Sequence, residues 1–506
     1  MTTEMVYAAL AAYILIGSIV AWLSRHGMGQ GMSEYFLANR SIGGLVAALT
    51  YSATTYSAFM MVGLAGLTYR GGVGAMGFEL IYLSGLVLVV FFGPRFWLAG
   101  KKYGYVTPAE MLGDRYQSRA VAVIAALANL IFLVPYSSVQ LAGVGLLLSG
   151  MTQGEITFTA GMILATILSI VWSMIAGMRS VAWTDSLQSV FMIITSTLVL
   201  FLVLAHLGGV DSLFAQLQQD YPQWLSVPGN GYFNFQTFLG LSLPWFFFSL
   251  TNPQVSQRLF IPRSMQSMRS MVNGFLIFGF IYTLVSILWG FSARILFPNL
   301  PNADLATPAL LGSGIVNPWL SLLVMVGIMA AAVSTIDSIL LTLSSMVARD
   351  IYHNMNPEAG EEQQLKIGKW VIPLIALIAY FFGSLQLDLI GVLSVASSAG
   401  LLIMVPVLVG TFFWKRGTAS AAVASMTLGS LTAVFLQFSS LKPLGLWPGI
   451  WTLIVATAVF WIVSLVTPAP HDKAEKFLSD LNQELTAKGV SQPLASIVDP
   501  GKITMN

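Results

Sequence analysis

Three hydroxyl residues and a carboxylate interrupt a long apolar run in the stretch AAAVSTIDSILL. Ser334, Thr335, Asp337 and Ser338 are related by steps of three and four residues, so on a helix they share one face. Hydroxyl and carboxylate oxygens are the ligands that a hard cation prefers. A carboxylate near mid-membrane costs about 2.5 to 3.5 kcal/mol on insertion scales, and such residues usually mark an ion or substrate path. The stretch therefore predicts a cation site.

Two alternatives bear on the carboxylates. Asp337 could instead join two helices while the hydroxyls bond to carbonyls of their own helix. Asp185, in GMRSVAWTDSLQ, is expected to open a span at its cytoplasmic end, where a helix cap would also explain it. If the two carboxylates approach each other, like-charge repulsion is relieved by a bound cation or a shared proton. The oxygens of Ser334 and Ser338 favour the cation.

Two apolar stretches contain helix interruptions. YSATTYSAFMMVGLAG, residues 51–66, crowds hydroxyl residues before small residues and glycines, so the helix can unwind and present its carbonyls to a cavity or a cation. LSLPWFFFSLTNPQVSQ contains Pro244, and Asn252 followed by Pro253, which interrupt helical hydrogen bonding. Paired interruptions at matching positions of two repeats indicate a transporter binding site.

The composition requires a membrane environment for these elements. The chain is 56% hydrophobic and 9% charged with a mean hydropathy of +0.79, whereas soluble proteins are about 45 to 50% apolar and about 25% charged. A net charge of +2 does not suggest a nucleic-acid partner, and the lack of cysteine excludes disulfides, thiolate metal sites and cysteine nucleophiles. The four histidines are scattered, so no enzyme active site is expected.

Hydropathy predicts an all-α integral membrane protein with about thirteen transmembrane helices. We expect the N-terminus outside and the C-terminus inside, because this arrangement puts 20 of the 23 Lys and Arg residues on the cytoplasmic side. Arg70, Arg294 and Lys442 are the three expected outside. The predicted spans are 5–23, 43–68, 75–97, 119–150, 155–177, 186–208, 235–257, 271–295, 316–347, 368–386, 389–413, 418–438 and 446–467.

The spans group into five expected segments. They are a leading transmembrane helix with an inner loop (1–42), a first five-helix repeat (43–208), a second inverted repeat (235–413), two accessory helices (418–467) and a cytoplasmic tail (468–506). The mixed charges of the tail predict a soluble helix followed by a flexible end, with nothing catalytic.

Several motifs together resemble the sodium:solute symporter family. They are SEYFLANRSIGG, YVTPAEMLGDRY, GMRSVAWTDSLQ, and AAAVSTIDSILL leading into ARDIY. The resemblance implies a LeuT-like 5+5 inverted repeat with one extra leading helix, and alternating access driven by sodium. It implies a multi-pass protein of the plasma membrane, expected to be the bacterial inner membrane. The expected partners are a small organic solute, sodium ions and the lipid bilayer, with Na⁺ as the coupling ion and only metal, and no cofactor.

The resemblance also implies two ion sites. The sodium site shared by the family corresponds to backbone carbonyls of the broken first core helix and to a carbonyl and two hydroxyls on the eighth: Ala53, Tyr56, Ala331, Ser334 and Thr335. A possible second sodium site, closer to the cytoplasm, corresponds to Asp185, Ser334, Asp337 and Ser338. Asp337 stands where better understood members have a hydroxyl, so a proton could replace the second sodium ion.

The solute is less sharply defined. Sugar-carrying members resemble the chain at Glu79, but their glutamine on the first core helix is Met60 here, and neither their lysine nor the arginine of sialic-acid members is present. We therefore expect a small carboxylate or amino-acid-like metabolite, held by hydroxyls, helix N-termini or a bound sodium ion. The alternatives are a sodium/sugar symporter and a proton-coupled carrier of the same fold. The candidate lining residues are Thr54, Thr55, Ser57, Glu79, Tyr136, Gln140, Trp245 and Asn252.

Overall fold

The computed structural model describes residues 2–25, 29–386, 390–439, 441–468 and 471–489. These residues form helices and their connections, with one isolated backbone bridge between Ile42 and Pro262. Within the described part of the chain, eleven helices are long and apolar enough to cross a membrane, and a bent pair makes twelve. A shorter helix, α11 (Phe235–Thr251), fills the remaining predicted span. The fold class is confirmed as all-helical and membrane-spanning, whereas the total of thirteen and the orientation stay predictions.

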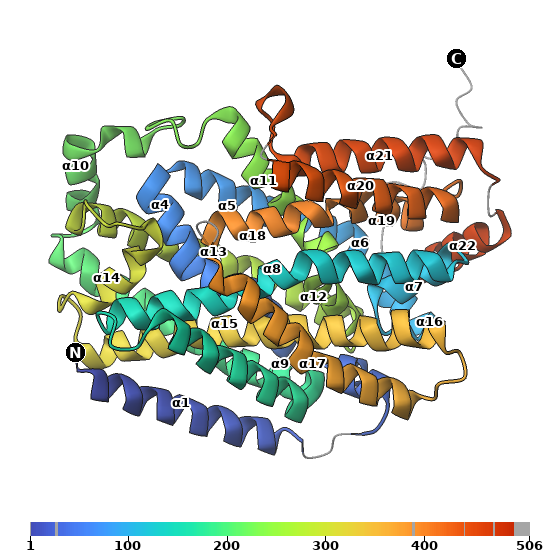
Figure 1. Ribbon diagram of the computed structural model, residues 1–506, viewed down its shortest axis with the longest axis horizontal. Helices are drawn as coiled ribbons and strands as arrows, with labels where there is room; N and C mark the ends of the chain where they lie inside the picture. The colour runs from blue at the N-terminus through green and yellow to red at the C-terminus, as the bar shows by residue number, and fades with distance from the viewer. Residues whose placement is uncertain (1, 26–28, 387–389, 440, 469–470, 490–506) are drawn as a thin grey trace.

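The remaining membrane helices follow the predicted spans closely, and two of the spans, Gly74–Tyr103 and Ile390–Phe413, each consist of two consecutive helices. In chain order they are α1 (Thr3–Leu23), α5 (Gly74–Ser84), α6 (Leu86–Tyr103), α8 (Arg119–Met151), α9 (Phe158–His206), α13 (Met265–Leu296), α15 (Pro318–Met346), α17 (Glu361–Ser384), α18 (Ile390–Gly400), α19 (Met404–Phe413), α20 (Ala419–Ser439) and α21 (Pro448–Val466). Figure 1 shows α1 and α21 at opposite edges of the bundle, with α15 between them. α15 packs against α9, α8 and α3 (Gly44–Thr55), so the predicted cation face lies in the interior.

The interruption predicted within residues 51–66 is present. α3 ends at Thr55, and Tyr56 has φ −91° and ψ 86°, outside the helical region. The chain resumes as a π-helical turn, η2 (Phe59–Leu64), which continues into α4 (Ala65–Gly71). The two parts are bent by 52°, so backbone carbonyls at the end of α3 are released from helical bonding.

The second interruption occurs at Asn252. α11 ends at Thr251, Asn252 has an extended backbone (φ −83°, ψ 111°), and α12 (Pro253–Ser256) begins with proline at its first turn, where proline is tolerated. α12 leads into the 3₁₀ turn η4 (Gln257–Phe260). Pro244 remains inside α11 without ending it. Of the predicted helix breakers, the Asn252–Pro253 pair therefore forms the break.

Two predicted spans are joined at Gly177 in α9. This glycine has φ 60° and ψ −174°, and a Cβ there would lie 2.9 Å from the carbonyl oxygen of Tyr35, so the sharp turn requires glycine. The second half of α9 spans Gly177–His206. The expectation that Asp185 opens the sixth span is therefore wrong, because the helix begins at this turn and Asp185 lies within it.

The tail contains one further helix, α22 (His471–Ala487). Phe477 of α22 stacks on Tyr103 at the end of α6, with ring centroids 5.5 Å apart, and the Tyr103 hydroxyl donates to Asp480 at 2.9 Å. Lys473 pairs with Asp114 of α7 (Pro108–Arg115) at 2.8 Å. The helix is thereby attached to the predicted cytoplasmic face, and the flexible end predicted after it lies outside the described residues.

Candidate ion and solute sites

The break after α3 and the polar face of α15 meet in a cluster of neutral oxygens. Thr335 Oγ1 lies 3.1 Å from the carbonyl oxygen of Ala53 and 3.4 Å from that of Thr54. Ser334 Oγ lies 3.4 Å from the Ala53 carbonyl oxygen and 3.0 Å from that of Ala331. Both hydroxyl side chains are buried. Four of the five residues predicted for the shared sodium site are therefore in direct contact.

Tyr56, the fifth residue predicted for that site, lies at the same break. It follows the last residue of α3, and its amide donates to the carbonyl of Ser52 at 2.7 Å. Its ring stacks on Phe275 and Phe278 of α13, with centroids 5.1 and 5.9 Å apart. These contacts fix the backbone where the helix unwinds, and the use of the Tyr56 carbonyl as an ion ligand stays a prediction.

A buried ion pair lies one turn along α15 from the oxygen cluster. Arg258 of η4 donates from Nη2 to Asp185 Oδ2 at 3.2 Å and to Ser338 Oγ at 2.6 Å. Its Nη1 donates to the carbonyl of Gln254 at 3.1 Å, and Thr50 Oγ1 donates to Asp185 Oδ2 at 2.6 Å. Both charged side chains are 0% exposed. The pair thus links α3, α9, α12 and α15.

Such a pair is stable only with dense hydrogen bonding. Removing two charges from water costs several kcal/mol per ion, and the attraction between them repays this cost only when further hydrogen bonds satisfy both groups. Ser338, Thr50 and the Gln254 carbonyl provide such bonds, whereas Asp185 Oδ1 has no hydrogen-bond partner among the described residues. Losing one partner would leave the other charged and buried, which costs about 3 to 5 kcal/mol.

The four residues predicted for a second sodium site divide among three partners. Ser334 contacts the Ala53 carbonyl, whereas Asp185 and Ser338 both contact Arg258. Asp337 faces the first half of α9, where its Oδ1 accepts a hydrogen bond from Ser173 Oγ at 3.1 Å. Arg258 is one of the 20 cations expected on the cytoplasmic side, and its burial was not predicted from the sequence. Its position just beyond the Asn252–Pro253 break is the signal that could have indicated it.

A group of aromatic side chains lies beside the buried Glu79 of α5. Trp245 Nε1 donates to Glu79 Oε2 at 3.1 Å, and the Trp245 ring lies 4.9 Å from Phe59 and from Phe248 and 5.5 Å from Phe78, between centroids. Glu79 is 0% exposed, and within the described chain its second oxygen, Oε1, has no hydrogen-bond partner. The group therefore presents a buried acceptor beside an apolar wall.

A second polar group is available on α8. Gln140 is 0% exposed, and neither atom of its side-chain amide has a hydrogen-bond partner among the described residues. A Cβ at Gly143, one turn further on, would lie 2.9 Å from the Cβ of Ala58, so the α8 backbone packs directly on the break that follows α3. Tyr136, one turn before Gln140, contacts Phe248 with ring centroids 5.8 Å apart.

The remaining solute candidates line the two helix breaks. Thr54 Oγ1 lies 3.1 Å from Ser338 Oγ, and Ser57 Oγ accepts from the Phe59 amide at 3.2 Å. Asn252 Nδ2 donates to Ser398 of α18 at 3.3 Å. Thr55 is buried at the last position of α3. The eight candidates therefore occupy the two breaks and the helices around them.

Polar contacts close the predicted cytoplasmic side below these sites. Gln257 Nε2 donates to the Val106 carbonyl at 2.8 Å, and Thr342 donates to Gln257 Oε1 at 2.7 Å. Further out, Thr107 Oγ1 donates to Asp350 Oδ2 at 2.7 Å. These contacts tie η4, and the π-helical turn η6 (Val347–Tyr352) that follows α15, to the segment before α7, so a path to the cytoplasm on this side would require that they separate.

Two broken helices, the first of which meets α15 at a buried oxygen cluster, inside a bundle of long apolar helices, are the mark of a secondary transporter. The sodium:solute symporter family model matches residues 35–429, so the chain belongs to that family. It is 27% identical to the sodium/pantothenate symporter of Escherichia coli (strain K12) over 470 residues, which cover 90% of this chain and 95% of that protein. It is 26% identical to the Haemophilus influenzae sodium/pantothenate symporter, covering 85% of this chain and 89% of that protein.

A solved structure supports the fold. The substrate-bound, outward-open structure of a Na⁺-coupled sialic acid symporter matches with a TM-score of 0.78 at 20% identity, covering 92% of this chain and 99% of that one. The predicted LeuT-like architecture is therefore confirmed. The protein is a multi-pass transporter of the plasma membrane that couples sodium to the symport of a small organic solute, and it is not an enzyme.

Proposed function

We propose that this symporter couples one sodium ion to the uptake of a small carboxylate-bearing metabolite. The ion binds to the carbonyls of Ala53, Tyr56 and Ala331 and the hydroxyls of Ser334 and Thr335. The single observation that carries this site is the contact of both hydroxyls with the Ala53 carbonyl at the end of α3. These neutral oxygens fit an alkali cation, which needs oxygen ligands but no carboxylate of its own.

The proposed ion number follows from Arg258. Asp185 and Ser338 would provide hard oxygens for a second cation, yet both already contact the Arg258 guanidinium. A sodium ion there would have to displace a positive group held by four helices. We infer that Arg258 takes the place of the second sodium ion, and that Asp337, bonded to Ser173, joins α15 to α9.

The solute class follows from the polar groups that remain available. Glu79 Oε1 can accept a hydrogen bond from a solute hydroxyl or N–H, and the Gln140 amide can both donate and accept. The carboxylate of the solute would be held by the sodium ion or by hydroxyls at the breaks, since the buried Arg258 is already paired. A hydroxylated amide carboxylate such as pantothenate, the solute named for two relatives, has these groups.

Two other functions remain as candidates. A neutral sugar or polyol is favoured by the same buried acceptor at Glu79, because such solutes carry many hydroxyl donors. A proton-coupled carrier is favoured by the buried Asp337, which could carry a proton instead of serving only as a link between helices.

Alternating access uses the contacts already described. Sodium at the break fixes α3 against α15, and the solute fills the space next to Glu79 and Gln140. Opening toward the cytoplasm separates η4 and η6 from the segment before α7, which breaks the Gln257 and Thr107 contacts. The ion and the solute then leave together on that side.

Uptake into membrane vesicles tests this proposal. Labelled pantothenate is supplied with and without a sodium gradient at fixed pH, against competing short carboxylates and simple sugars. Uptake that needs sodium and is reduced by carboxylates supports the proposal. Uptake driven by a pH gradient without sodium would favour the proton-coupled carrier, and competition by sugars alone would favour the sugar symporter.

A further inference from the structure

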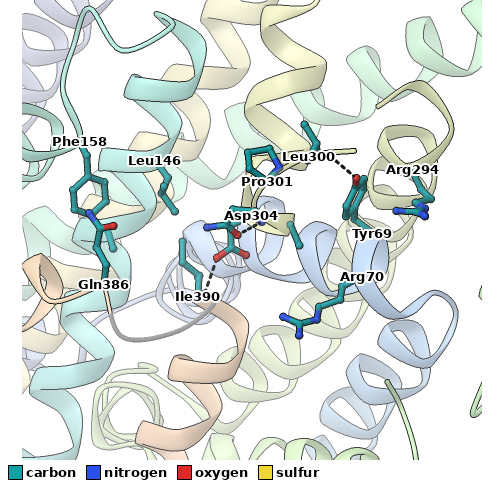
Figure 2. A pocket seen from close by; sticks show the side chains of 13 residues that line it. Tyr69, Arg70, Leu146, Phe158, Arg294, Leu300, Pro301, Asp304, Gln386 and Ile390 are labelled. Atoms are coloured by element: carbon teal, nitrogen blue, oxygen red, sulfur yellow. Dashed lines mark hydrogen bonds between the residues drawn. The ribbon is translucent and has the colours of Figure 1, made fainter. Parts of the chain in front are cut away.

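A cavity of about 550 Å³ opens on the predicted outer side of the bundle. Figure 2 shows residues that line it, which come from the end of α4, the outer part of α8, the start of α9, the end of α13, the segment before α14 (Ala306–Gly312), and the start of α18 with Gln386 before it. Phe158, Leu146 and Ile390 provide apolar surface, Gln386 provides an amide, and Arg70 and Arg294 provide positive charge. The site thus combines a cationic rim with an apolar wall.

This cavity holds most of the positive charge expected on the outer side of the protein. Only three cations were predicted outside, and two of them, Arg70 and Arg294, line this one cavity. The third, Lys442, lies over the Trp447 ring at 4.8 Å and is not among the lining residues. Asp304 also lines the cavity, but its Oδ2 accepts from the Ile390 amide at 2.8 Å, and two guanidinium groups outweigh its single charge.

Arg294 is held rigidly in place. Its guanidinium carbon lies 4.5 Å from the ring centroids of Tyr221 and Trp224 and 5.3 Å from that of Tyr69. Its Nη1 donates to the Pro298 carbonyl at 3.0 Å. Such stacking restricts an arginine while leaving N–H groups at its edge for a ligand. Arg70 is exposed and lies 4.9 Å from the Tyr232 ring centroid, so it can reorient toward an incoming anion.

Ile390 separates this cavity from the solute region at the helix break. A Cβ at Gly63 would lie 3.1 Å from Ile390 Cγ2, and one at Gly143 would lie 3.7 Å from Ile390 Cδ1. The Ile390 side chain therefore lies between the turn after the break and the part of α8 that follows Gln140. Ile390 thus lines the cavity and also contacts the helix turn that follows the break.

We propose that this cavity is an outer capture site for the carboxylate solute, an inference that rests on the proposed function. The solute carboxylate binds Arg70 and the edge of Arg294, and its body packs on Phe158 and Leu146 before it passes Ile390. Clefts lined by charge of one sign raise the local concentration and the association rate of the opposite charge by about 10- to 1,000-fold. The cavity thereby selects anionic solutes before sodium and the central site act.

Binding without sodium tests the capture site separately from transport. Saturation-transfer NMR detects ligand binding to the purified full-length protein in sodium-free choline buffer. Pantothenate is compared with pantothenol, in which a hydroxymethyl group replaces the carboxylate. The expected result is a pantothenate signal that exceeds the pantothenol signal and falls at least threefold in Arg70→Gln. The matched control Lys442→Gln, the third predicted outer cation, should bind like the parent.

Arg294→Gln is expected to act in the same direction, but it also removes stacking from three rings, so Arg70→Gln is the decisive variant. Sodium-driven uptake in Arg70→Gln should show a KM raised about fivefold at low salt with unchanged kcat, and the difference should shrink as salt screens the charges. Equal pantothenate signals in parent, Arg70→Gln and Lys442→Gln would overturn the capture site. Sodium-free binding without sodium-driven uptake would retain it and overturn the proposed function instead.

Discussion

The oxygen cluster around Ser334 and Thr335 and the ion-pair cluster around Ser338 lie one helical turn apart on α15. They differ in whether the positive charge they face belongs to the protein. In the oxygen cluster, Ser334 and Thr335 face the Ala53 carbonyl, and every polar atom named there is neutral. In the ion-pair cluster, Ser338 and Asp185 face the Arg258 guanidinium. The first arrangement leaves its oxygens for a mobile cation, whereas the second holds a cation that is part of the chain.

This difference shows how one helix can carry two cation positions with separate functions. A mobile ion must bind and leave in each cycle, so its site needs ligands that are adequate but not charged enough to trap it. A covalently attached guanidinium cannot leave, so the carboxylate of Asp185 can balance it permanently. Replacing residues in the two clusters should therefore have different effects on stability and on sodium-dependent uptake. The expected effects range from loss of the folded protein to almost no change.

The largest effect is expected from Asp185→Asn. The change leaves the Arg258 guanidinium charged in a fully buried position, which costs about 3 to 5 kcal/mol. Thermal unfolding of the purified protein should show a large drop in stability, together with loss of uptake. The double variant Asp185→Asn, Arg258→Gln removes both charges and should recover part of the stability.

A matched control for this prediction is the pair between Lys415 and Glu475, whose side chains are 61% and 65% exposed. Exposed pairs contribute about 0 to 1 kcal/mol, so Glu475→Gln should leave unfolding nearly unchanged. If Asp185→Asn is as stable as Glu475→Gln, the buried pair of Asp185 and Arg258 does not stabilise the fold.

The next largest effect is expected from the double change Ser334→Ala, Thr335→Ala. Loss of both hydroxyl ligands should raise the sodium concentration for half-maximal uptake about tenfold or more, since about 1.4 kcal/mol corresponds to each tenfold change in affinity. Sodium titration of uptake measures this shift. Ser344→Ala is the control on the same helix, because that hydroxyl bonds back to the Leu341 carbonyl at 3.1 Å and should leave the sodium dependence unchanged.

Arg258→Gln should change the ion number and not only the affinity. Without the guanidinium, Asp185 is left charged and buried, at a cost of about 3 to 5 kcal/mol. A sodium ion bound to Asp185 and Ser338, at the second site predicted from the sequence, would offset that cost. We expect sodium activation of uptake to become sigmoidal, with a Hill coefficient rising from near one toward two, and higher sodium to stabilise the variant. A hyperbolic sodium dependence in correctly folded Arg258→Gln would show that this position cannot bind sodium.

The smallest effect is expected from Asp337→Ser. Among the described residues Asp337 accepts a hydrogen bond from Ser173 and makes none with the side chains of either cluster, so its removal should keep uptake and leave the sodium dependence within about twofold of the parent. Sodium titrations at several pH values measure this. A changed proton dependence, or sodium affinity altered by more than tenfold, would bring Asp337 into the coupling mechanism.

Some of these features could be predicted from the sequence because they depend on local spacing. The positions of Ser334 and Thr335 on one helical face, and the interruptions near Tyr56 and Asn252, follow from residue types over a few turns. The apolar runs were long enough for hydropathy to find most helices. The motifs then indicated which of these helices form the core.

Other features depend on contacts between distant segments and could not be predicted in this way. Arg258 is one charge at the edge of an apolar window, so averaging hides it, and its partner Asp185 is 73 residues away in sequence. The sharp turn at Gly177 could not be predicted without knowing that the Tyr35 carbonyl lies against it. Likewise, nothing in the stretch around Asp337 indicates that Ser173 would face it.

The coupling ratio tests the contrast between the two clusters most directly. Proteoliposomes containing the parent protein are given labelled sodium and labelled pantothenate, and the initial fluxes of both are compared. One sodium ion per solute is expected, which makes uptake of a monovalent carboxylate electroneutral and insensitive to membrane potential. Two sodium ions per solute, with uptake accelerated by an inside-negative potential, would contradict the role assigned to Arg258.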